Sequence, residues 1–227
     1  MIVEKRQVLT WISFPEAQAL RPGLRTVYLQ AAKKQPLWTH IRQAFTSYEL
    51  DLSLSTEQRW QQYSVGLRSD LRRSKQLSLE VRRHQDPTQL IALLTLTNSS
   101  KGLSVVDSGH FRTTDHFLIT EMLDIEVGVL AAHAYLLDGP YKRVKLAYNA
   151  SAFRKFPRGS RQRSRCGLAN ILLFDQDFDY FRQAGYSLLD FGGYGADAGT
   201  RHFKDKFGGR RVQQYNYFPI WYYGYRK

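Results

Sequence analysis

A run of cations between Arg154 and Arg165 is the part of this sequence that most directly suggests a chemistry. Six of its twelve residues are basic, namely Arg154, Lys155, Arg158, Arg161, Arg163 and Arg165. Runs of like charge are commonly solvated surface loops. Clustered guanidinium groups also form strong paired hydrogen bonds with phosphate oxygens. The run therefore fits either a solvated loop or a clamp on a phosphorylated ligand.

Polar residues at the ends of two predicted strands are the other candidates for chemistry. Tyr148, followed by Asn149 and Ser151, closes one strand just before the basic run. A tyrosine at that place can carry a proton during attack by an amine. Asp190 ends the second strand and is followed by two glycines. Its carboxylate either caps a turn or faces a cleft at the strand end, where open α/β sheets place ligands.

Composition limits the possible partners and compartments. The 227 residues include 33 Lys and Arg against 20 Asp and Glu, which gives a formal net charge of +13. Such a charge favours a polyanionic partner, for example RNA, a phosphorylated cofactor, an anionic lipid headgroup or an acidic glycan. Cys166 is the only cysteine, so neither an internal disulfide nor a thiolate metal cluster is expected. The histidines show no metal-binding spacing, and we expect no metal site.

The ends and hydropathy of the chain suggest a cytoplasmic protein. The first residues lack the apolar run of a signal peptide. No stretch approaches the roughly 18 apolar residues that a membrane helix needs. With 43% apolar and 14% aromatic residues, the chain can bury one sizeable core. We therefore expect a single domain over residues 1–227.

The first half of the chain reads as strands around helices. Residues 24–30 and 48–54 have strand-like patterns, and in the second of them apolar residues alternate with polar ones. Ser55 and Gln58 have the spacing of a capping box, so a helix is predicted over about 56–75. A short strand at 78–83 and a helix after Pro87 follow.

The second half predicts a meander followed by alternating helices and strands. Asp138-Gly139 offers the left-handed backbone of a tight hairpin, and Gly185 offers a helix stop. The predicted elements are strands at 117–123, 127–135 and 144–148, a helix over about 168–184, a strand at 186–191, a helix at 200–206 and a strand at 212–223. This order indicates an α/β (α+β) domain with a central mixed sheet flanked by helices.

Two pairs of motifs give the sequence a family likeness. Residues 185–193 read G-Y-x-x-x-D-F-G-G, and residues 203–209 read F-K-x-x-F-G-G. A weaker pair is D-L-S at 51–53 followed by R-x-x-L-R at 68–72. The chain thereby resembles GNAT-fold acyltransferases of the FemAB-like superfamily, which includes the Fem aminoacyltransferases. The likeness covers about residues 45–223 and leaves 1–44 as an N-terminal extension of strand and helix.

The resemblance implies a single GNAT-like unit with a donor site at the start of the helix after the meander. GNAT-like domains bind a pyrophosphate there, on free N–H groups at the positive end of the helix dipole. In this sequence the cradle would lie near Ser164, and the matching positions are Gly167, Leu168, Ala169 and Asn170. Arg161, Arg163 and Arg165 would clamp the donor phosphates. The resemblance also implies that Lys204 lies near the substrate, with Tyr148 and Asp190 as further catalytic candidates.

Three functions follow as expectations. The first is acyl transfer from a phosphopantetheine thioester, such as acetyl-CoA, another acyl-CoA or an acyl carrier protein, to an amine on a small molecule or glycan. The second is Fem-like transfer from aminoacyl-tRNA, which the charge and the Fem likeness favour. The third is a non-catalytic RNA-binding module. The size of the chain and the cradle pattern favour the thioester, which would be a cosubstrate and not a permanently bound cofactor.

Overall fold

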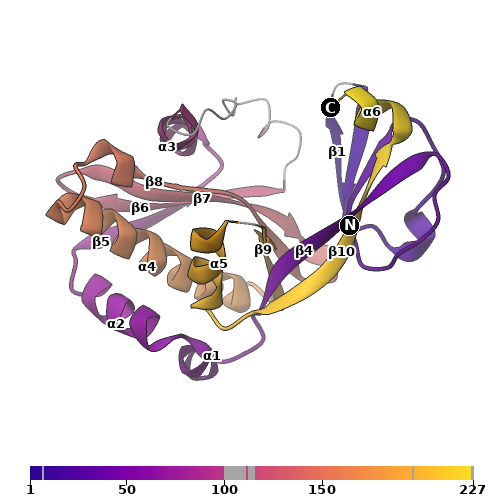
Figure 1. Ribbon diagram of the computed structural model, residues 1–227. Helices are drawn as coiled ribbons and strands as arrows, with labels where there is room; N and C mark the ends of the chain where they lie inside the picture. The colour runs from indigo at the N-terminus through magenta and orange to yellow at the C-terminus, as the bar shows by residue number, and fades with distance from the viewer. Residues whose placement is uncertain (7, 100–110, 112–115, 196, 226–227) are drawn as a thin grey trace.

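The computed structural model describes residues 1–6, 8–99, 111, 116–195 and 197–225, and its strands form one ten-stranded sheet (Figure 1). The strands are β1 (Ile2–Arg6), β2 (Leu9–Ser13), β3 (Thr26–Ala31), β4 (His40–Asp51), β5 (Leu79–His84), β6 (Phe117–Asp124), β7 (Gly128–Asp138), β8 (Arg143–Ser151), β9 (Leu188–Gly193) and β10 (Arg210–Pro219). Their order across the sheet is β1-β2-β3-β10-β4-β9-β8-β7-β6-β5. The sheet is mixed, as predicted.

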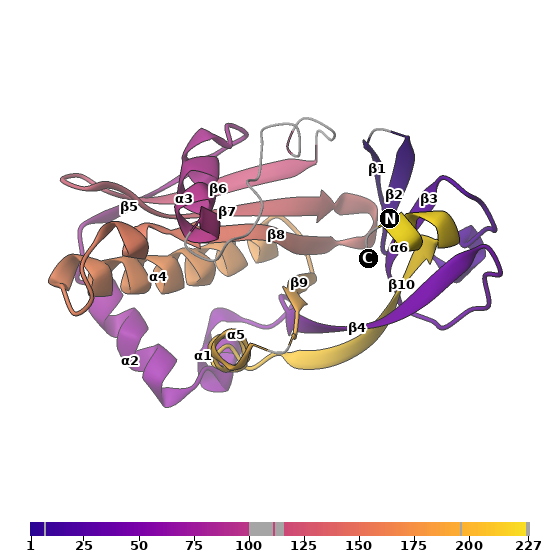
Figure 2. The same cartoon turned by 45° about the horizontal axis from the view of Figure 1, so that its top comes forward.

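Helices lie on both faces of the β5–β9 part of the sheet, and one further helix, α6, lies beside β10 and β4. They are α1 (Thr56–Gln62), α2 (Val65–Ser74), α3 (Thr88–Ser99), α4 (Arg161–Gln183), α5 (Ala198–Asp205) and α6 (Ile220–Tyr225), with short 3-10 turns at Ala17–Ala19, Gly139–Tyr141 and Ala152–Lys155. Helix α3 packs on β7 and β8 from one side, whereas α4 packs on β6 and β7 from the other (Figures 1 and 2). Strands β1–β3 and α6 gather at the far end of the molecule (Figure 2). No described helix is both long and apolar enough to cross a membrane.

Two pairs of strands in this sheet run parallel, and one of them matters for the site. Strands β2 and β3 are parallel, and so are β8 and β9, which α4 connects. The remaining neighbours are antiparallel, including the β6-β7-β8 meander. A parallel pair needs a crossover connection, and here the long α4 provides it. The β8-α4-β9 unit therefore brings the C-terminal ends of β8 and β9 to the same edge of the sheet.

The predicted apolar stripe of α4 fills the main core. Ile171, Phe174, Phe178 and Phe181 are all buried, at the three- and four-residue spacing of one helix face. The ring of Phe174 meets that of Phe191 on β9 at 4.9 Å between centroids. Gly185 ends the helix with φ +85°, as expected for a glycine stop.

The predicted helix at 56–75 is in fact two helices. The capping box at its start is confirmed, because Gln58 N–H donates to Ser55 Oγ and Ser55 N–H donates to Gln58 Oε1. The chain turns at Tyr63, and Ser64 caps the second helix by accepting from Leu67 N–H. A serine favours this cap over a helix interior because its side chain competes for backbone N–H groups.

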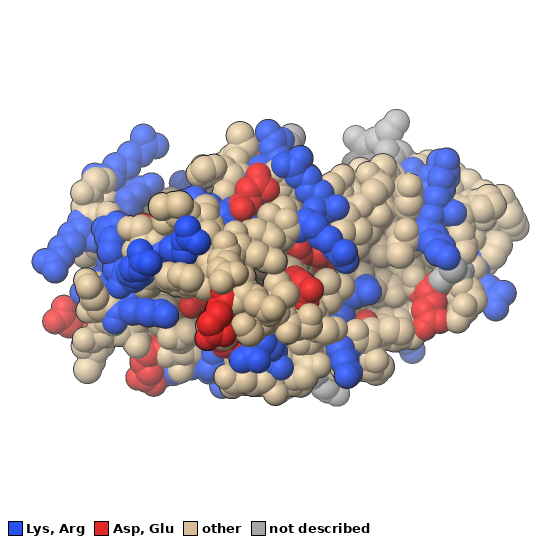
Figure 3. Space-filling view, turned by 90° about the horizontal axis from the view of Figure 1, so that it is seen from below, with Lys and Arg blue, Asp and Glu red and all other residues tan. Residues whose placement is uncertain are grey.

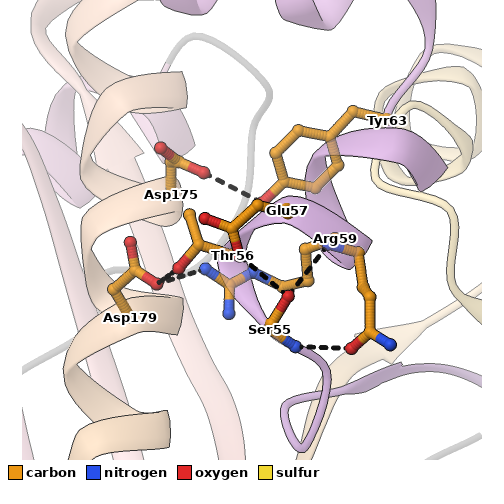
Figure 4. Close-up of polar contacts among 8 residues, drawn as sticks. Ser55, Thr56, Glu57, Arg59, Tyr63, Asp175 and Asp179 are labelled. Carbon is orange, nitrogen blue, oxygen red and sulfur yellow. Dashed lines mark hydrogen bonds and ion pairs between the residues drawn. The ribbon is translucent and has the colours of Figure 1, made fainter.

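Helix α1 is anchored to α4 by polar contacts that Figure 4 shows. Tyr63 donates to Asp175 at 2.9 Å, and Thr56 donates to Asp179 at 2.9 Å. The buried guanidinium of Arg59 forms an ion pair with Asp179. These contacts hold α1 and the turn after it against α4, which lies more than 100 residues further along the chain.

One predicted turn and one predicted strand end were wrong in detail. The β7–β8 connection is a 3-10 turn over Gly139–Tyr141, and Lys142, with φ 49°, takes the left-handed conformation that was predicted for Asp138-Gly139. Pro140 explains this, because its fixed φ suits the 3-10 turn. The predicted strand at 212–223 ends at Pro219, which lacks the N–H that would continue a ladder, and α6 follows.

Candidate functional site

A cleft opens where β8 and β9 separate. The two strands pair at Arg143–Leu188, Val144–Leu189 and Lys145–Asp190. Beyond this pairing, residues 146–151 of β8 and Phe191 with Gly192 of β9 line opposite sides of a cleft of about 590 Å³. When parallel strands diverge, their facing N–H and C=O groups lose their partners and need a ligand or water. The cleft is thus an opening between the diverging ends of two parallel strands.

Lys204 lies in this cleft and satisfies the β9 side. This residue of α5 is buried, and its Nζ donates to the carbonyl oxygens of Phe191 at 2.7 Å and Gly193 at 2.9 Å. Gly192, between those two carbonyls, has φ +81°, which favours glycine. The D-F-G-G and F-K motifs therefore meet in space. Gly192 of the first motif bends the end of β9, and Lys204 of the second binds the carbonyl groups on either side of that bend.

Burial gives Lys204 an unusual ionisation. Removal from water lowers the pKa of Lys204 to about 8, whereas the nearby carboxylate of Asp190 acts in the opposite direction. An amine with this pKa exists in both charge states near neutral pH. Because an ammonium has three N–H donors and two are used by the carbonyls, one is left for a ligand in the cleft.

Asp190 does not line the cleft, and its predicted place at a strand end needs correction. It lies within β9, not at its end, and it is fully buried. Its carboxylate accepts from Gln30 Nε2 at 2.5 Å, from Ser47 Oγ at 2.8 Å and from Gly192 N–H at 2.8 Å. Asp190 therefore binds the N-terminal strands to the bent end of β9 and influences Lys204 through its charge.

Of the other predicted site residues, Tyr148 and Asn170 line the cleft. Tyr148 comes from β8, and its ring packs on that of Phe111 at 5.4 Å between centroids. Asn170 comes from α4, with its Oδ1 3.0 Å from His133 Nε2. His133 was not predicted as a site residue. The signal in the sequence was its place between Ala131 and Tyr135 on the inward side of a predicted strand.

The predicted donor cradle does not lie at the start of the helix, because α4 begins earlier than expected. The helix starts at Arg161, and Ser160 caps it by accepting from Arg163 N–H at 3.2 Å. Gly167 is therefore two turns inside the helix, where its N–H belongs to the intrahelical ladder. Neither Leu168 nor Ala169 lines the cleft, and Ala169 is fully buried. The positive end of the helix dipole is at Ser160.

The three predicted phosphate-binding arginines have different surroundings. Arg165 forms an ion pair with the buried carboxylate of Asp124 at 2.5 Å, so its charge is used within the fold. The guanidinium of Arg163 stacks over Phe153, 4.9 Å from the ring centroid, and Phe153 lines the cleft. Arg161 is exposed at the first position of the helix. Cations at the helix start thus lie next to one wall of the cleft.

A metal centre is not evident in the described part of the chain. Across those ranges, no three His, Cys, Asp or Glu side chains are grouped so that they could hold a metal ion.

The fold is similar to that of several solved structures. The crystal structure of FemX matches with a TM-score of 0.63 and 12% identity, over 86% of this chain and 66% of the FemX chain. L-PGS from Bacillus licheniformis matches with a TM-score of 0.55 and 12% identity, over 86% of this chain and 68% of the other. The C-terminal domain of an Agrobacterium fabrum protein, named as a putative lysylphosphatidylglycerol synthetase, matches with a TM-score of 0.55 and 14% identity. The match covers 85% of this chain and 67% of the other.

These likenesses establish the fold, and the predicted GNAT-like architecture is confirmed. The neighbours are GNAT-fold proteins related to acyltransferases. The chain spans slightly less than two thirds of the length of FemX. No protein-family model and no curated protein sequence matches the chain.

Proposed function

We propose that this protein transfers an acyl group from a phosphopantetheine thioester to an amine in the cleft between β8 and β9. The separation of these two parallel strands after Lys145 and Asp190 is the observation that carries the proposal. An extended, amide-containing pantetheine arm can pair with an open strand edge as a further strand would. The β8 edge at residues 146–151 offers such a partner.

Two parts of the proposed site suit the two ends of such a donor. Phosphates would lie at the start of α4, where the helix dipole, Arg161 and Arg163 favour anions. The acyl carbon would lie between Tyr148 and Lys204. The donor site proposed here is therefore the helix start near Ser160, and Gly167 and Ala169 are not part of it.

The reaction itself is simple to balance. The amine nitrogen attacks the thioester carbonyl carbon, a C–N bond forms, the C–S bond breaks, and the proton lost by the amine passes to the departing sulfur. Positioning the two reactants together supplies much of the rate enhancement. In this proposal Tyr148 carries the proton, and the third N–H of the Lys204 ammonium donates to the acyl oxygen.

Aminoacyl-tRNA is the second candidate donor, and a different part of the molecule favours it. The indole of Trp60 on α1 has the guanidinium of Arg72 and the ammonium of Lys75 each 5.6 Å from a ring centroid. The basic, partly aromatic surface of α1 and α2 fits a nucleic-acid backbone. The chemistry in the cleft would be the same, with an ester C–O bond broken in place of C–S. A non-catalytic RNA-binding module would use this surface but not the cleft.

Native mass spectrometry of freshly purified protein tests the proposal, followed by titration with acetyl-CoA, longer acyl-CoAs and aminoacyl-tRNA. We expect a coenzyme-sized ligand, and tighter binding of acyl-CoA than of CoA-free acyl thioesters. The double variant Arg161→Gln, Arg163→Gln should weaken acyl-CoA binding about tenfold or more, since each charge-assisted hydrogen bond contributes about 1.5–3 kcal/mol.

Gly167→Ala is the matched control on the same helix. A Cβ there meets no atom within 4 Å, so the variant should leave donor affinity unchanged. If the protein retains tRNA and does not bind acyl-CoA, aminoacyl-tRNA takes the place of the thioester as the proposed donor. Binding of RNA with no transfer of any acyl group to any amine tested would favour the non-catalytic module.

A further inference from the structure

A second pocket, separate from the cleft, lies where the ends of β2 and β3 meet the β7–β8 hairpin. It has a volume of about 330 Å³, and none of its lining residues also lines the cleft. Phe14 gives it an aromatic wall just after β2, and Ala31 lines it at the end of β3. The hairpin contributes Asp138, Tyr141 and Arg143. Three segments that are distant in sequence therefore build this pocket.

Backbone strain is concentrated around the same pocket. Among the described residues, the non-glycine residues with positive φ are Phe14, Gln30 and Lys142, at 55°, 59° and 49°. Phe14 and Gln30 line the pocket, and Lys142 lies between two lining residues, Tyr141 and Arg143. Such conformations are costly and persist where the surrounding structure enforces them, commonly at ligand sites. Their gathering at one pocket is the pattern expected of a binding site.

The guanidinium of Arg143 is held on the pocket wall and lacks a counter-ion there. It stacks on Phe14, with Cζ 4.3 Å from the ring centroid. Its Nε is buried with no hydrogen-bond partner, and the guanidinium forms neither a hydrogen bond nor an ion pair with any described residue. Because Nε is shut off from solvent, the two Nη groups are the donors that a ligand can use. This cation therefore calls for an acceptor from outside the chain.

The two carboxylates that line the pocket already have partners. Asp138 accepts from the amino group of Met1 at 2.5 Å. Glu16 accepts from the hydroxyl group of Tyr141 and from the side-chain amide of Gln18. Their acceptor oxygens are thus used within the fold, and the hydrogen-bonding capacity left over in the pocket is that of donors.

We propose that this pocket binds the carboxylate of a small molecule through Arg143. A planar carboxylate matches the paired N–H groups of a guanidinium. Its single negative charge suits Arg143, with Lys33 exposed beside it, better than the double charge of a phosphate monoester would so near two acidic residues. The apolar lining from Phe14, Leu20 and Ala31 suits an aliphatic body on that carboxylate. The pocket is a second ligand site, independent of the proposed acyl transfer.

N-acetyl-L-leucine and N-acetyl-L-leucinamide are matched probes of this site. They share one apolar body, and only the first carries a carboxylate. Titration of ¹⁵N-labelled protein with each, followed at the backbone amide signals of residues 30–33 and 141–143, reports binding at the pocket. In a series from N-acetylglycine to N-acetyl-L-leucine, we expect at least one acid to bind about tenfold or more tightly than its amide, because charge-assisted hydrogen bonds are the stronger ones. Inorganic phosphate should bind more weakly than that acid.

Variants at Arg143 test which residue holds the carboxylate. Arg143→Gln should weaken binding of the acid about tenfold or more, and Arg143→Lys, which keeps the charge without the paired N–H groups, should lie between. Arg42→Gln is the matched control, since the guanidinium of Arg42 also stacks on an aromatic ring, that of Tyr215, but does not line the pocket. It should leave the affinity unchanged. The comparison of acid with amide uses the wild-type chain, so it holds even if Arg143→Gln folds poorly.

The proposal is overturned if every acid binds no better than its amide, or if no acid of the series moves these signals. Unchanged affinity in a well-folded Arg143→Gln variant would remove Arg143 from the site. Tighter binding of phosphate than of every acid would contradict the carboxylate assignment. These titrations contain no acyl donor, so a failure to find acyl transfer would leave their result standing.

Discussion

Lys204 shows how one residue combines a structural and a chemical role. Its ammonium holds the two carbonyls that flank Gly192, and thus the bent end of β9. Its burial also lowers its pKa to about 8, so that folding has to remove the ammonium from water below that pH. The same desolvation that lowers the pKa of Lys204 therefore reduces stability at neutral pH.

The pH dependence of stability tests this ionisation. Between pH 8 and about 10.5 the folded protein binds fewer protons at Lys204 than the unfolded chain, so its stability should rise with pH in that window. Urea unfolding at pH 7.5 and 9.5 should show that the wild type gains stability relative to Lys204→Met. Asp190→Asn should extend the window to lower pH, because the carboxylate of Asp190 raises the folded-state pKa of Lys204 and the unfolded pKa is unchanged.

Lys206→Met is the control for this measurement. Lys206 lies two residues further on and is only half-buried, so this variant removes the same charge without removing a buried ammonium. A difference between the wild type and Lys204→Met that is independent of pH would contradict a lowered pKa at Lys204.

At the scale of elements, the F-G-G end of the F-K-x-x-F-G-G motif, residues 207–209, is closely packed. Phe207 is buried in the main core. A Cβ at Gly208, where φ is +72°, would lie 2.6 Å from the Cβ of Gln62 on α1. A Cβ at Gly209 would lie 2.5 Å from Cε1 of Tyr48 on β4 and would also strike the Glu49 carbonyl oxygen. The motif thus lets the chain pass between α1 and β4 as it enters β10.

Gly209→Ala should therefore destabilise the protein by about 2 kcal/mol or more, because the added methyl forces backbone apart. Chemical denaturation with urea measures the change. Gly66→Ala is the matched comparison: nothing lies within 4 Å of its Cβ and it is inside α2, so the change should stabilise by roughly 0.5–1 kcal/mol. Similar effects of the two substitutions would show that Gly209 is not a packing requirement.

At the scale of the whole molecule, the excess of cations is unevenly distributed. Figure 3 shows Lys and Arg side chains crowded at one end of the face seen from below, the end that carries α2. Arg72 and Arg73 of α2 and Lys75, which caps its C-terminus, are exposed. Part of the formal charge of +13 is therefore gathered at the end of the molecule that carries α2.

Salt dependence tests whether this surface binds RNA. Each phosphate neutralised contributes about 0.7–0.9 to the slope of log K against log salt. If RNA docks on α2, the triple variant Arg72→Gln, Arg73→Gln, Lys75→Gln should reduce the slope for tRNA by about 2, as measured by fluorescence anisotropy. The same number of charges removed at Lys5, Lys33 and Lys34 should leave the slope unchanged, because these exposed lysines lie on β1 and just after β3 and not on α2.

Equal reductions in both triple variants would indicate diffuse attraction to the net charge, with no docking surface on α2. Acyl-CoA binding should respond to salt far less than tRNA binding in every variant, since few phosphates are involved.

Much of the fold could be predicted from local patterns. The alternation in β7 and β8, the apolar stripe of α4 and the glycine stop at Gly185 each depend on residues close in sequence. The D-F-G-G and F-K motifs were sufficient to predict a GNAT-like sheet, and Tyr148, Asn170 and Lys204 do lie in one cleft. These predictions held because periodicity and turn chemistry are short-range properties.

Other features required the tertiary structure. The start of α4 depended on Ser160 as a cap, and this moved the positive end of the helix away from Gly167. The burial of Asp190 followed from Gln30 and Ser47, which come from strands more than 140 residues away. His133 lies behind the cleft only because β7 and α4 place it between Asp177 and Asn170. The sequence by itself determined the elements and their faces, whereas long-range packing decided which polar groups meet, because contacts between distant segments leave no periodic trace in the chain.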